Sequence, residues 1–381
     1  MNVKEKYREQ IASFLGIESK QVHVYWKGRV GLYAILKAMG IGPGDEVVLP
    51  AFTCVVVPNA IKYLGAMPIY VDINPKTLCC DVDSVIQALG PKTKAILIQN
   101  MLGLSVHVSE IVALAHDKGI YTIEDCTHGF GGKNQGVFNG LKSDVAFFST
   151  QWNKPYSTGI GGMLVVNNLA LIDPVQTINN KLIEPSRKDN IELSILLWSR
   201  RYLLKGLTYW TLLKLYRILG KRGLITGSSN ALEISGTDAP KDYFKGMSTV
   251  QCKAGIKALK KMNDTLAFRR NSAMLVHEYL LKNGKATVPN EFLNDHSFLK
   301  YPILVAERSA FMNFAESSRI PLGDWFISPL HPVMGSLEAW DLNPNKFPNA
   351  VYVSKHIVNL PLDIPNQTLI NFLELYKNEI I

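Results

Sequence analysis

Short apolar segments alternate with segments of helical spacing between about residues 29 and 168. The apolar runs are rich in Val, Ile, Leu and Phe, as expected of buried strands, and read DEVVLPAF, PIYVDI, KAILIQNML, YTIED, DVAFFST and GGMLVVNN. Helical spacing is found in RVGLYAILKAMG, VVPNAIKYLG, DVDSVIQALG and VSEIVALAHDKG. Strands that alternate with helices predict an α/β fold whose mostly parallel sheet is covered on both faces. Ligands of such sheets bind at the carboxyl ends of the strands.

The alternation stops after residue 170, and the pattern then predicts two further regions. Residues 171–235 form a long basic stretch rich in Leu, Trp and Tyr. From about residue 247 a long helical pattern leads into short strands, including FLKYPILVA, and a last helix. A chain of 381 residues is long enough for two domains. We therefore expect a large domain over residues 1–240, with an insert at about 171–235, and a smaller C-terminal α+β domain over residues 241–381.

The composition favours a soluble protein of a reducing compartment. Five cysteines, an odd number without CxxC spacing, argue against a disulfide framework. The N-terminal segment MNVKEKYREQIASFLG is charged and lacks the apolar core of a signal peptide. The one uncharged window of membrane-spanning length, residues 155–172, contains a proline, three glycines and two asparagines, which are unfavourable in a spanning helix. These features predict a cytoplasmic protein.

Positive charge is concentrated in the insert. The chain has 41 Lys and Arg against 32 Asp and Glu, and residues 186–225 hold nine of the basic residues but only two acidic ones. The simplest interpretation is a pair of helices that packs on the large domain or across a dimer, with the basic residues solvated. A second hypothesis is contact with an anionic membrane through a helical stripe of Lys214, Arg217 and Lys221 and a second cluster at 200–205. Nucleic acid is disfavoured, because no recognised binding module accompanies the charge.

Four residues at or after predicted strand ends could carry chemistry. Asp125 ends the strand YTIED, with His128 three residues later, and Ser149 ends DVAFFST, five residues before Lys154. Taken singly, each has an ordinary explanation as a cap, a packed histidine or a solvated loop lysine. Together, the carboxylate, the hydroxyl and a lysine followed by the glycine turn TGIGG suit a pyridoxal 5'-phosphate (PLP) site. No HExxH, zinc-ligand cluster, GxSxG or Walker loop competes with this hypothesis.

Longer motifs connect this hypothesis to a family. The segments IGPGDEVVLPAFT, GAMPIYVDI, IEDCTHGFGG and STQWNKPYSTGIGG follow one another in family order and spacing. Through them the chain resembles, over most of its length, the DegT/StrS family of PLP-dependent sugar aminotransferases. The resemblance implies the fold type I architecture and a homodimer with sites at the subunit boundary. It also implies transfer of an amino group from glutamate or glutamine to a keto sugar, nucleotide-linked, for cell-surface glycan or secondary-metabolite biosynthesis.

The resemblance assigns roles to the four candidate residues. Lys154 matches the catalytic lysine that forms the Schiff base with PLP, and Asp125 matches the carboxylate that partners the pyridine nitrogen. His128 falls at the position of a Gln or His beside the ring hydroxyl. Ser149 matches the serine that binds the cofactor phosphate. The family thus places all four residues around PLP.

Other matched positions carry departures from the family pattern. Gly28 and Arg29 fall where Gly-Thr begins a helix that holds phosphate through its backbone N–H groups, and the guanidinium could itself hold phosphate. Cys54 stands beside the cofactor ring, where an aromatic residue commonly stacks. His331, in SPLHPV, matches a histidine near the substrate. These positions predict an intact transamination core with an altered ring-stacking contact.

Two further departures keep alternatives open. Ile160 replaces a family glutamate, and Phe244 replaces an asparagine that reaches the cofactor of the neighbouring subunit. One alternative is a non-catalytic protein that binds a sugar or the cofactor. The other is a PLP-dependent sugar dehydratase, but relatives of that kind have a histidine in place of the lysine, so Lys154 argues against it.

Overall fold

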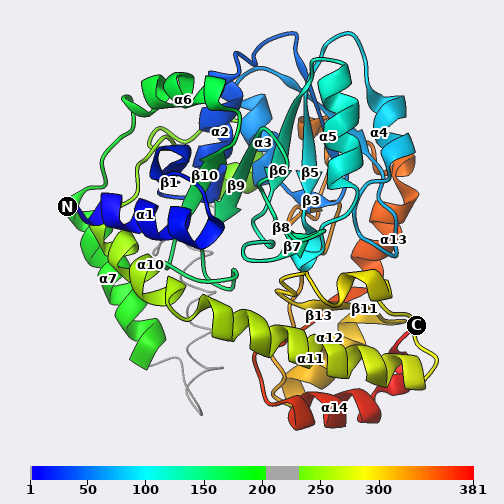
Figure 1. The fold of residues 1–381 in the computed structure, drawn as a ribbon. Helices are drawn as coiled ribbons and strands as arrows, with labels where there is room; N and C mark the ends of the chain where they lie inside the picture. Colours follow the sequence, from blue (N-terminus) through cyan, green and yellow to red (C-terminus); the bar gives the residue numbers. More distant parts are fainter. Residues whose placement is uncertain (1, 203–230) are drawn as a thin grey trace.

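The computed structural model describes residues 2–202 and 231–381, and its centre is a seven-stranded sheet with the order β1-β10-β9-β6-β5-β2-β4 (Figure 1). The strands β4, β2, β5, β6 and β9 run parallel, whereas β10 and β1 are antiparallel to their neighbours. The predicted mostly parallel sheet is therefore confirmed. In chain order the strands of this sheet are β1 (Val22–Tyr25), β2 (Glu46–Pro50), β4 (Met67–Val71), β5 (Thr93–Gln99), β6 (Tyr121–Asp125), β9 (Val145–Ser149) and β10 (Gly162–Val166).

Alternating strand residues supply the two apolar faces of the sheet. Val47 and Leu49 pack with α2 (Gly28–Ala38) and α3 (Val56–Lys62) in one buried cluster. Val48 and Ile96 face the opposite side, where α4 (Val82–Ala88) and α5 (Val108–Asp117) cover them. This division follows from the two-residue period of a strand, which sends successive side chains to opposite faces.

Two helices far apart in sequence cover the sheet near β9 and β10. Tyr7, on α1 (Val3–Leu15), is completely buried and belongs to one cluster with Phe148 and with Cys252 of α10 (Thr249–Leu259). The helical pattern expected from residue 247 is two helices, because the chain leaves α10 at Lys260 before α11 (Met262–Lys282) begins. Residues after 240 therefore also contribute to the packing of the central sheet.

The C-terminal part of the chain forms a smaller layer below the sheet in Figure 1. Its two-stranded antiparallel sheet consists of β11 (Tyr301–Leu304) and β13 (Ile357–Leu360). Helices α12 (Arg308–Ser317) and α14 (Asn366–Leu375) lie in this layer, whereas α13 (Pro348–His356) runs from it along the side of the sheet near α4 in Figure 1. A short strand, β12 (Leu330–His331), leaves this part and pairs in parallel with β3 (Thr53–Cys54), which follows β2. The smaller layer is thereby joined to the carboxyl end of the central sheet.

Several short elements complete the described chain. A hairpin consists of β7 (Lys133–Asn134) and β8 (Val137–Phe138). Single 3₁₀ turns lie at Ser19–Gln21, Met101–Gly103, Leu169–Leu171, Asn290–Phe292, Glu338–Trp340, Pro344–Lys346 and Lys377–Glu379.

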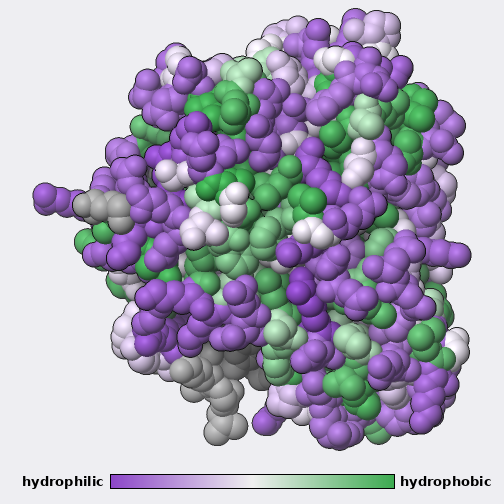
Figure 2. Space-filling model, viewed as in Figure 1, coloured by the Kyte–Doolittle hydropathy of each residue, from purple (hydrophilic) through white to green (hydrophobic). Residues whose placement is uncertain are grey.

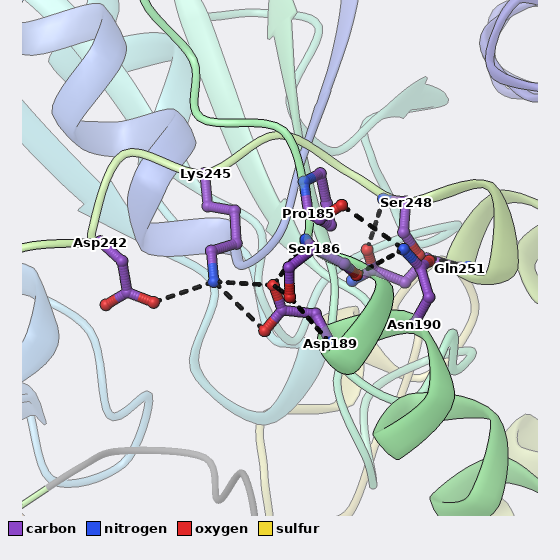
Figure 3. A network of polar contacts seen from close by, with 8 residues as sticks. All are labelled: Pro185, Ser186, Asp189, Asn190, Asp242, Lys245, Ser248 and Gln251. Carbon is purple, nitrogen blue, oxygen red and sulfur yellow. Dashed lines mark hydrogen bonds and ion pairs between the residues drawn. The ribbon is translucent and has the colours of Figure 1, made fainter.

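The described parts of the insert contain α6 (Ile172–Asn179), α7 (Arg187–Tyr202) and α9 (Ala231–Ser235). A polar network holds the start of α7 (Figure 3). Lys245 Nζ lies 2.9 Å from a carboxylate oxygen of Asp242 and 3.2 Å from one of Asp189, and the Ser186 hydroxyl donates to Asp189. The inner face of α7 buries Leu193, so the expected packing on the large domain holds for this helix.

The proposed membrane stripe of Lys214, Arg217 and Lys221 lies outside the described residues. None of the helices formed by residues 2–202 and 231–381 combines the length and the apolar character that a membrane crossing needs.

Candidate active site

Two neighbouring parallel strands bring the predicted acid and hydroxyl to the same edge of the sheet. Asp125 is the last residue of β6, and Ser149 is the last residue of β9. The two strands pair in register, with Asp125 opposite Phe147. Because carboxyl ends of parallel strands meet at one edge, these residues, 24 positions apart in sequence, lie at the same edge of the sheet.

Asp125 is a buried acid with one carboxylate oxygen already engaged. Its Oδ1 accepts a hydrogen bond of 2.9 Å from the backbone N–H of Thr127. Burial raises the pKa of the carboxyl above its ordinary value, while the bonds from Thr127 and the charge of Lys154 act in the opposite direction. A cationic group placed against this carboxylate would offset the cost of its burial.

Lys154 follows β9 on a loop and is partly buried against an aromatic ring. Its Nζ lies 4.5 Å from the centre of the Trp325 ring system. Burial lowers the pKa of the lysine from its ordinary 10.5 to about 8, although the nearby Cys54 and Asp125 favour the charged form. The fraction of free amine at neutral pH is therefore far larger than for a solvated lysine. This is the protonation behaviour that a lysine with a nucleophilic role needs.

Two histidines near this lysine, the buried His128 and the half-buried His331, are held in the neutral form. The Nδ1 atom of His128 accepts a hydrogen bond of 3.1 Å from the Leu102 backbone, so the proton of the neutral ring resides on Nε2. Burial lowers the pKa of His128 well below its ordinary value, and the charge of Lys154 adds to the effect. Burial likewise lowers the pKa of His331 to about 4. His331 pairs with Cys54 across β12 and β3, so both predicted residues reach the cleft from different parts of the chain.

A backbone cradle lies beside Ser149. Helix α2 begins at Gly28. The side chain of its N-cap residue, Lys27, makes no capping hydrogen bond to the N–H groups of the first turn. A Cβ atom on Gly162 would lie 2.1 Å from the Gly28 nitrogen, so only glycine allows the return strand to pass this close. A helix N-terminus next to a serine hydroxyl is a suitable site for an anion such as phosphate.

Arg29 itself is held by a carboxylate that the sequence did not point to. Its guanidinium forms an ion pair with Glu233 of α9, and both side chains are almost completely buried. The carboxylate outweighs the effect of burial and raises the pKa of Arg29 above its ordinary value. Asn59 donates a hydrogen bond of 2.8 Å to the Glu233 backbone carbonyl. The guanidinium that we expected to bind phosphate thus has a protein partner, which leaves phosphate binding mainly to the backbone of α2.

Helix α7 of the insert also contacts the lysine loop, which is the segment 150–161 between β9 and β10 that carries Lys154. Arg200, on α7, donates a hydrogen bond of 2.8 Å to Asn153 and lies 4.8 Å from the ring of Trp152. Leu193 and Leu197 of the same helix lie next to Gly159, beyond Lys154. No pattern in the neighbouring sequence pointed to these contacts or to those of Glu233. For Trp325, the one indication is its position six residues before the predicted His331.

These residues fit PLP. Asp125 can hold the proton of a pyridine nitrogen, the start of α2 with Ser149 can bind a phosphate, and Lys154 can attach the cofactor. A buried acid, a lysine with a depressed pKa and an uncapped helix N-terminus at the ends of adjacent parallel strands define a PLP-dependent transferase of the α/β class.

The chain belongs to the DegT/DnrJ/EryC1/StrS aminotransferase family, whose sequence profile matches residues 2–200 and 241–366. PLP is the cofactor of this family. The predicted family and cofactor are therefore confirmed.

Relatives with known names and structures agree with this assignment. The chain is 39% identical over 160 residues to GDP-perosamine synthase of Escherichia coli O157:H7, covering 41% of this chain and 44% of that protein. It is 34% identical over 157 residues to dTDP-4-dehydro-2,3,6-trideoxy-D-glucose 4-aminotransferase of Saccharopolyspora spinosa, covering 41% of each. Both matches thus span less than half of the relatives' length. The crystal structure of the aminotransferase TlmJ from Streptoalloteichus hindustanus has the same fold, with a TM-score of 0.74 and 22% identity over 99% of this chain and 91% of that one.

Proposed function

We propose that the protein is a PLP-dependent sugar aminotransferase that moves an amino group from glutamate or glutamine to a keto sugar. The observation that carries this proposal is the position of Lys154, whose pKa is lowered to about 8, at the strand ends that bear Asp125 and Ser149. The relatives support a nucleotide-linked acceptor, because two of them are named for GDP- and dTDP-linked sugars. Amino sugars of this type enter cell-surface glycans or secondary metabolites.

Each residue of the site has a distinct task in this proposal. PLP, when bound, supplies the electron sink that stabilises negative charge on the carbon next to the amine. Asp125 keeps the pyridine nitrogen protonated, and the Nε2–H of neutral His128 is available to the ring hydroxyl. Lys154 is the base that removes the proton from the α-carbon of the amino donor, since its amine is partly unprotonated at neutral pH. Ser149 and the start of α2 fix the phosphate.

The attachment of PLP to Lys154 is the first test. Borohydride reduction of the purified holoenzyme, followed by peptide mass spectrometry, should locate the cofactor on the peptide that contains Lys154. The Lys154→Ala variant should fold, lose covalent cofactor and lose turnover by several orders of magnitude. Lys142→Ala is the matched control, because Lys142 is a half-buried lysine that bonds Ser109 and Asn134 away from the cleft. Attachment to any other lysine would contradict the assignment.

The substrate assignment has a separate test. The amine form of the cofactor, loaded onto the enzyme with glutamate or glutamine, is offered a panel of nucleotide-linked keto sugars in a single turnover. Return of the absorbance of the PLP form of the holoenzyme with one class of acceptor identifies that class. Failure of both donors to convert the cofactor would exclude the proposed amino donors without affecting the Lys154 assignment.

We further propose a cytoplasmic homodimer. The five cysteines are all free, in line with a reducing compartment.

Apolar residues gather in the middle of the face shown in Figure 2 and are ringed by polar ones. On α7, the side chains of Ile191, Ile195 and Trp198 are each more than half exposed and share one helical stripe. A second copy of the chain would cover such surface, and peripheral contact of the basic insert with an anionic membrane is the competing explanation.

A further inference from the structure

Aromatic and imidazole rings surround Lys154 on the side of the smaller domain. The indole of Trp325 is stacked on the imidazole of His128, with 4.9 Å between ring centres and an angle of 7° between planes. The same indole is the ring that faces Lys154 Nζ at 4.5 Å. The next residue, Phe326, stacks instead on His331 at 5.0 Å and packs against Phe52. Trp325 is thus the aromatic side chain turned toward the lysine.

The backbone of Trp325, which lies outside the helices and strands, is fixed by a buried amide on β13. Asn359, on β13, is completely buried. Its Oδ1 accepts a hydrogen bond of 3.0 Å from the Trp325 N–H, and its Nδ2 donates one of 2.7 Å to the Trp325 carbonyl. The backbone of Asn359 also pairs with Gly323 in both directions. Because the side-chain amide satisfies both backbone polar groups of Trp325, the backbone segment that carries the indole is held in one position.

Position 54, which also lies near Lys154, carries no aromatic side chain. Cys54 is half-buried beside the site, and its thiol senses the charges of Arg29, Lys154 and Asp125. A thiol offers little surface to the face of a pyridine ring. A stacked aromatic partner contributes energy beyond the area it buries, and the electron-rich indole is the best partner for a ring that carries positive charge. The carboxylate of Asp125 keeps such a ring protonated in the proposed function.

We propose that Trp325 is the aromatic residue that stacks on the pyridine ring of PLP, in place of the aromatic side chain that Cys54 does not provide. This inference rests on the proposed attachment of PLP to Lys154, since the indole is positioned against that nitrogen. Trp325 is a cofactor-positioning residue contributed by the smaller domain, and Asn359 holds it in place.

Cofactor affinity is the direct test, because it does not depend on turnover. The full-length protein is stripped of PLP and titrated with PLP by absorbance. Trp325→Leu keeps an apolar side chain but removes the ring, and it should raise the Kd about 5- to 10-fold. Trp325→Phe should stay within about 3-fold of the wild type, because it retains an aromatic face. Tyr352→Leu is the control, because Tyr352 is an exposed aromatic side chain on α13, where its ring lies against His356.

A rescue experiment separates stacking from a purely structural role. Adding Cys54→Phe to Trp325→Leu restores an aromatic ring on the opposite side of the cleft, and the Kd should return to within about 3-fold of the wild type. A Trp325→Leu variant that binds PLP as tightly as the wild type would overturn the proposal. Equal loss in the Leu and Phe variants, or no recovery with Cys54→Phe, would also overturn it.

Fluorescence provides a measurement that does not require the leucine variant to fold. The chain has six tryptophans, and the one stacked on PLP should be strongly quenched when the cofactor binds. The amplitude of quenching should therefore fall in Trp325→Phe relative to the wild type. Equal amplitudes in Trp325→Phe and the wild type would exclude stacking. If the wild type itself bound no PLP, the proposed function would fail rather than the assignment of Trp325 alone.

Discussion

At the scale of single residues, the site combines charge with burial. Lys154, Asp125 and His128 each have a pKa displaced toward the neutral form, and burial is the largest cause in every case. Displacements of this kind cluster at catalytic sites. The unfavourable free energy of burying these groups is offset by favourable packing elsewhere in the fold.

The pKa of Lys154 leads to a prediction for the protein without PLP. Acetylation of Lys154 by a brief pulse of acetic anhydride should increase with pH around a midpoint near 8, because only the unprotonated amine reacts. Peptide mass spectrometry measures the extent of acetylation, and the solvated lysines of the same digest serve as the internal control, with midpoints above 10. A Lys154 midpoint above 10 would contradict the prediction.

The same displacement fixes the sign of a stability effect. Between about pH 8 and 10.5 the unfolded chain binds the lysine proton more tightly than the folded protein does. The contribution of Lys154 to the free energy of unfolding should therefore increase as the pH rises through this window. Comparison of the wild type with Lys154→Met by chemical denaturation at the two ends of the window isolates this contribution.

At the scale of elements, the site depends on how closely α2 approaches β9 and β10. A Cβ atom on Gly28 would lie 2.7 Å from the Phe148 carbonyl oxygen, and one on Gly162 would collide with the Gly28 nitrogen. The helix N-terminus can therefore lie beside Ser149 only because glycine occupies both positions. Helix α7 supports the next loop from outside, through Arg200 and Leu193.

Substitution of one of these glycines should separate α2 from the strand ends. Gly162→Ala is expected to lower the free energy of unfolding by about 1–3 kcal/mol. It should also weaken PLP binding by at least about 10-fold, because it displaces the N–H groups of the cradle. Denaturant titration and PLP titration measure the two effects. Gly335→Ala is the matched control, since nothing lies near the added methyl group there, and it should change neither quantity. Normal PLP affinity in Gly162→Ala would show that the cradle does not hold the phosphate.

At the scale of the whole molecule, the site is assembled from both parts of the chain. The strands β6 and β9 supply Asp125 and Ser149, whereas the pairing of β12 with β3 brings His331 beside Cys54. Trp325 comes from the same C-terminal stretch and closes over Lys154. Movement of the smaller layer would therefore alter the site directly. The exposed stripe of α7 lies on the helix that supports the lysine loop, which connects the proposed dimer surface to the site.

The proposed homodimer predicts a defined sedimentation behaviour. The wild type should sediment as a dimer at micromolar concentration, and the double variant Ile195→Glu with Trp198→Glu should shift toward monomer, because it places charges in the covered face. Leu375→Glu, on an exposed position of α14, is the control and should remain dimeric. A fully active wild-type monomer at this concentration would contradict the dimer. Binding of such a monomer to anionic but not neutral vesicles at low salt would instead favour the membrane explanation.

The sequence by itself determined the features that depend on neighbours along the chain. The two-residue and 3.6-residue periods located six of the seven strands of the central sheet, all except β1, together with helices α2 to α5 between them. The positions of Asp125, Ser149 and Lys154 relative to strand ends indicated the cofactor. Only the tertiary structure decided which distant residues meet them. Glu233 pairs with Arg29 across 204 positions, and Asn359 of β13 binds the backbone of Trp325. These contacts arise from the packing of separate elements, and no local pattern of hydrophobic and polar residues encodes which elements will touch.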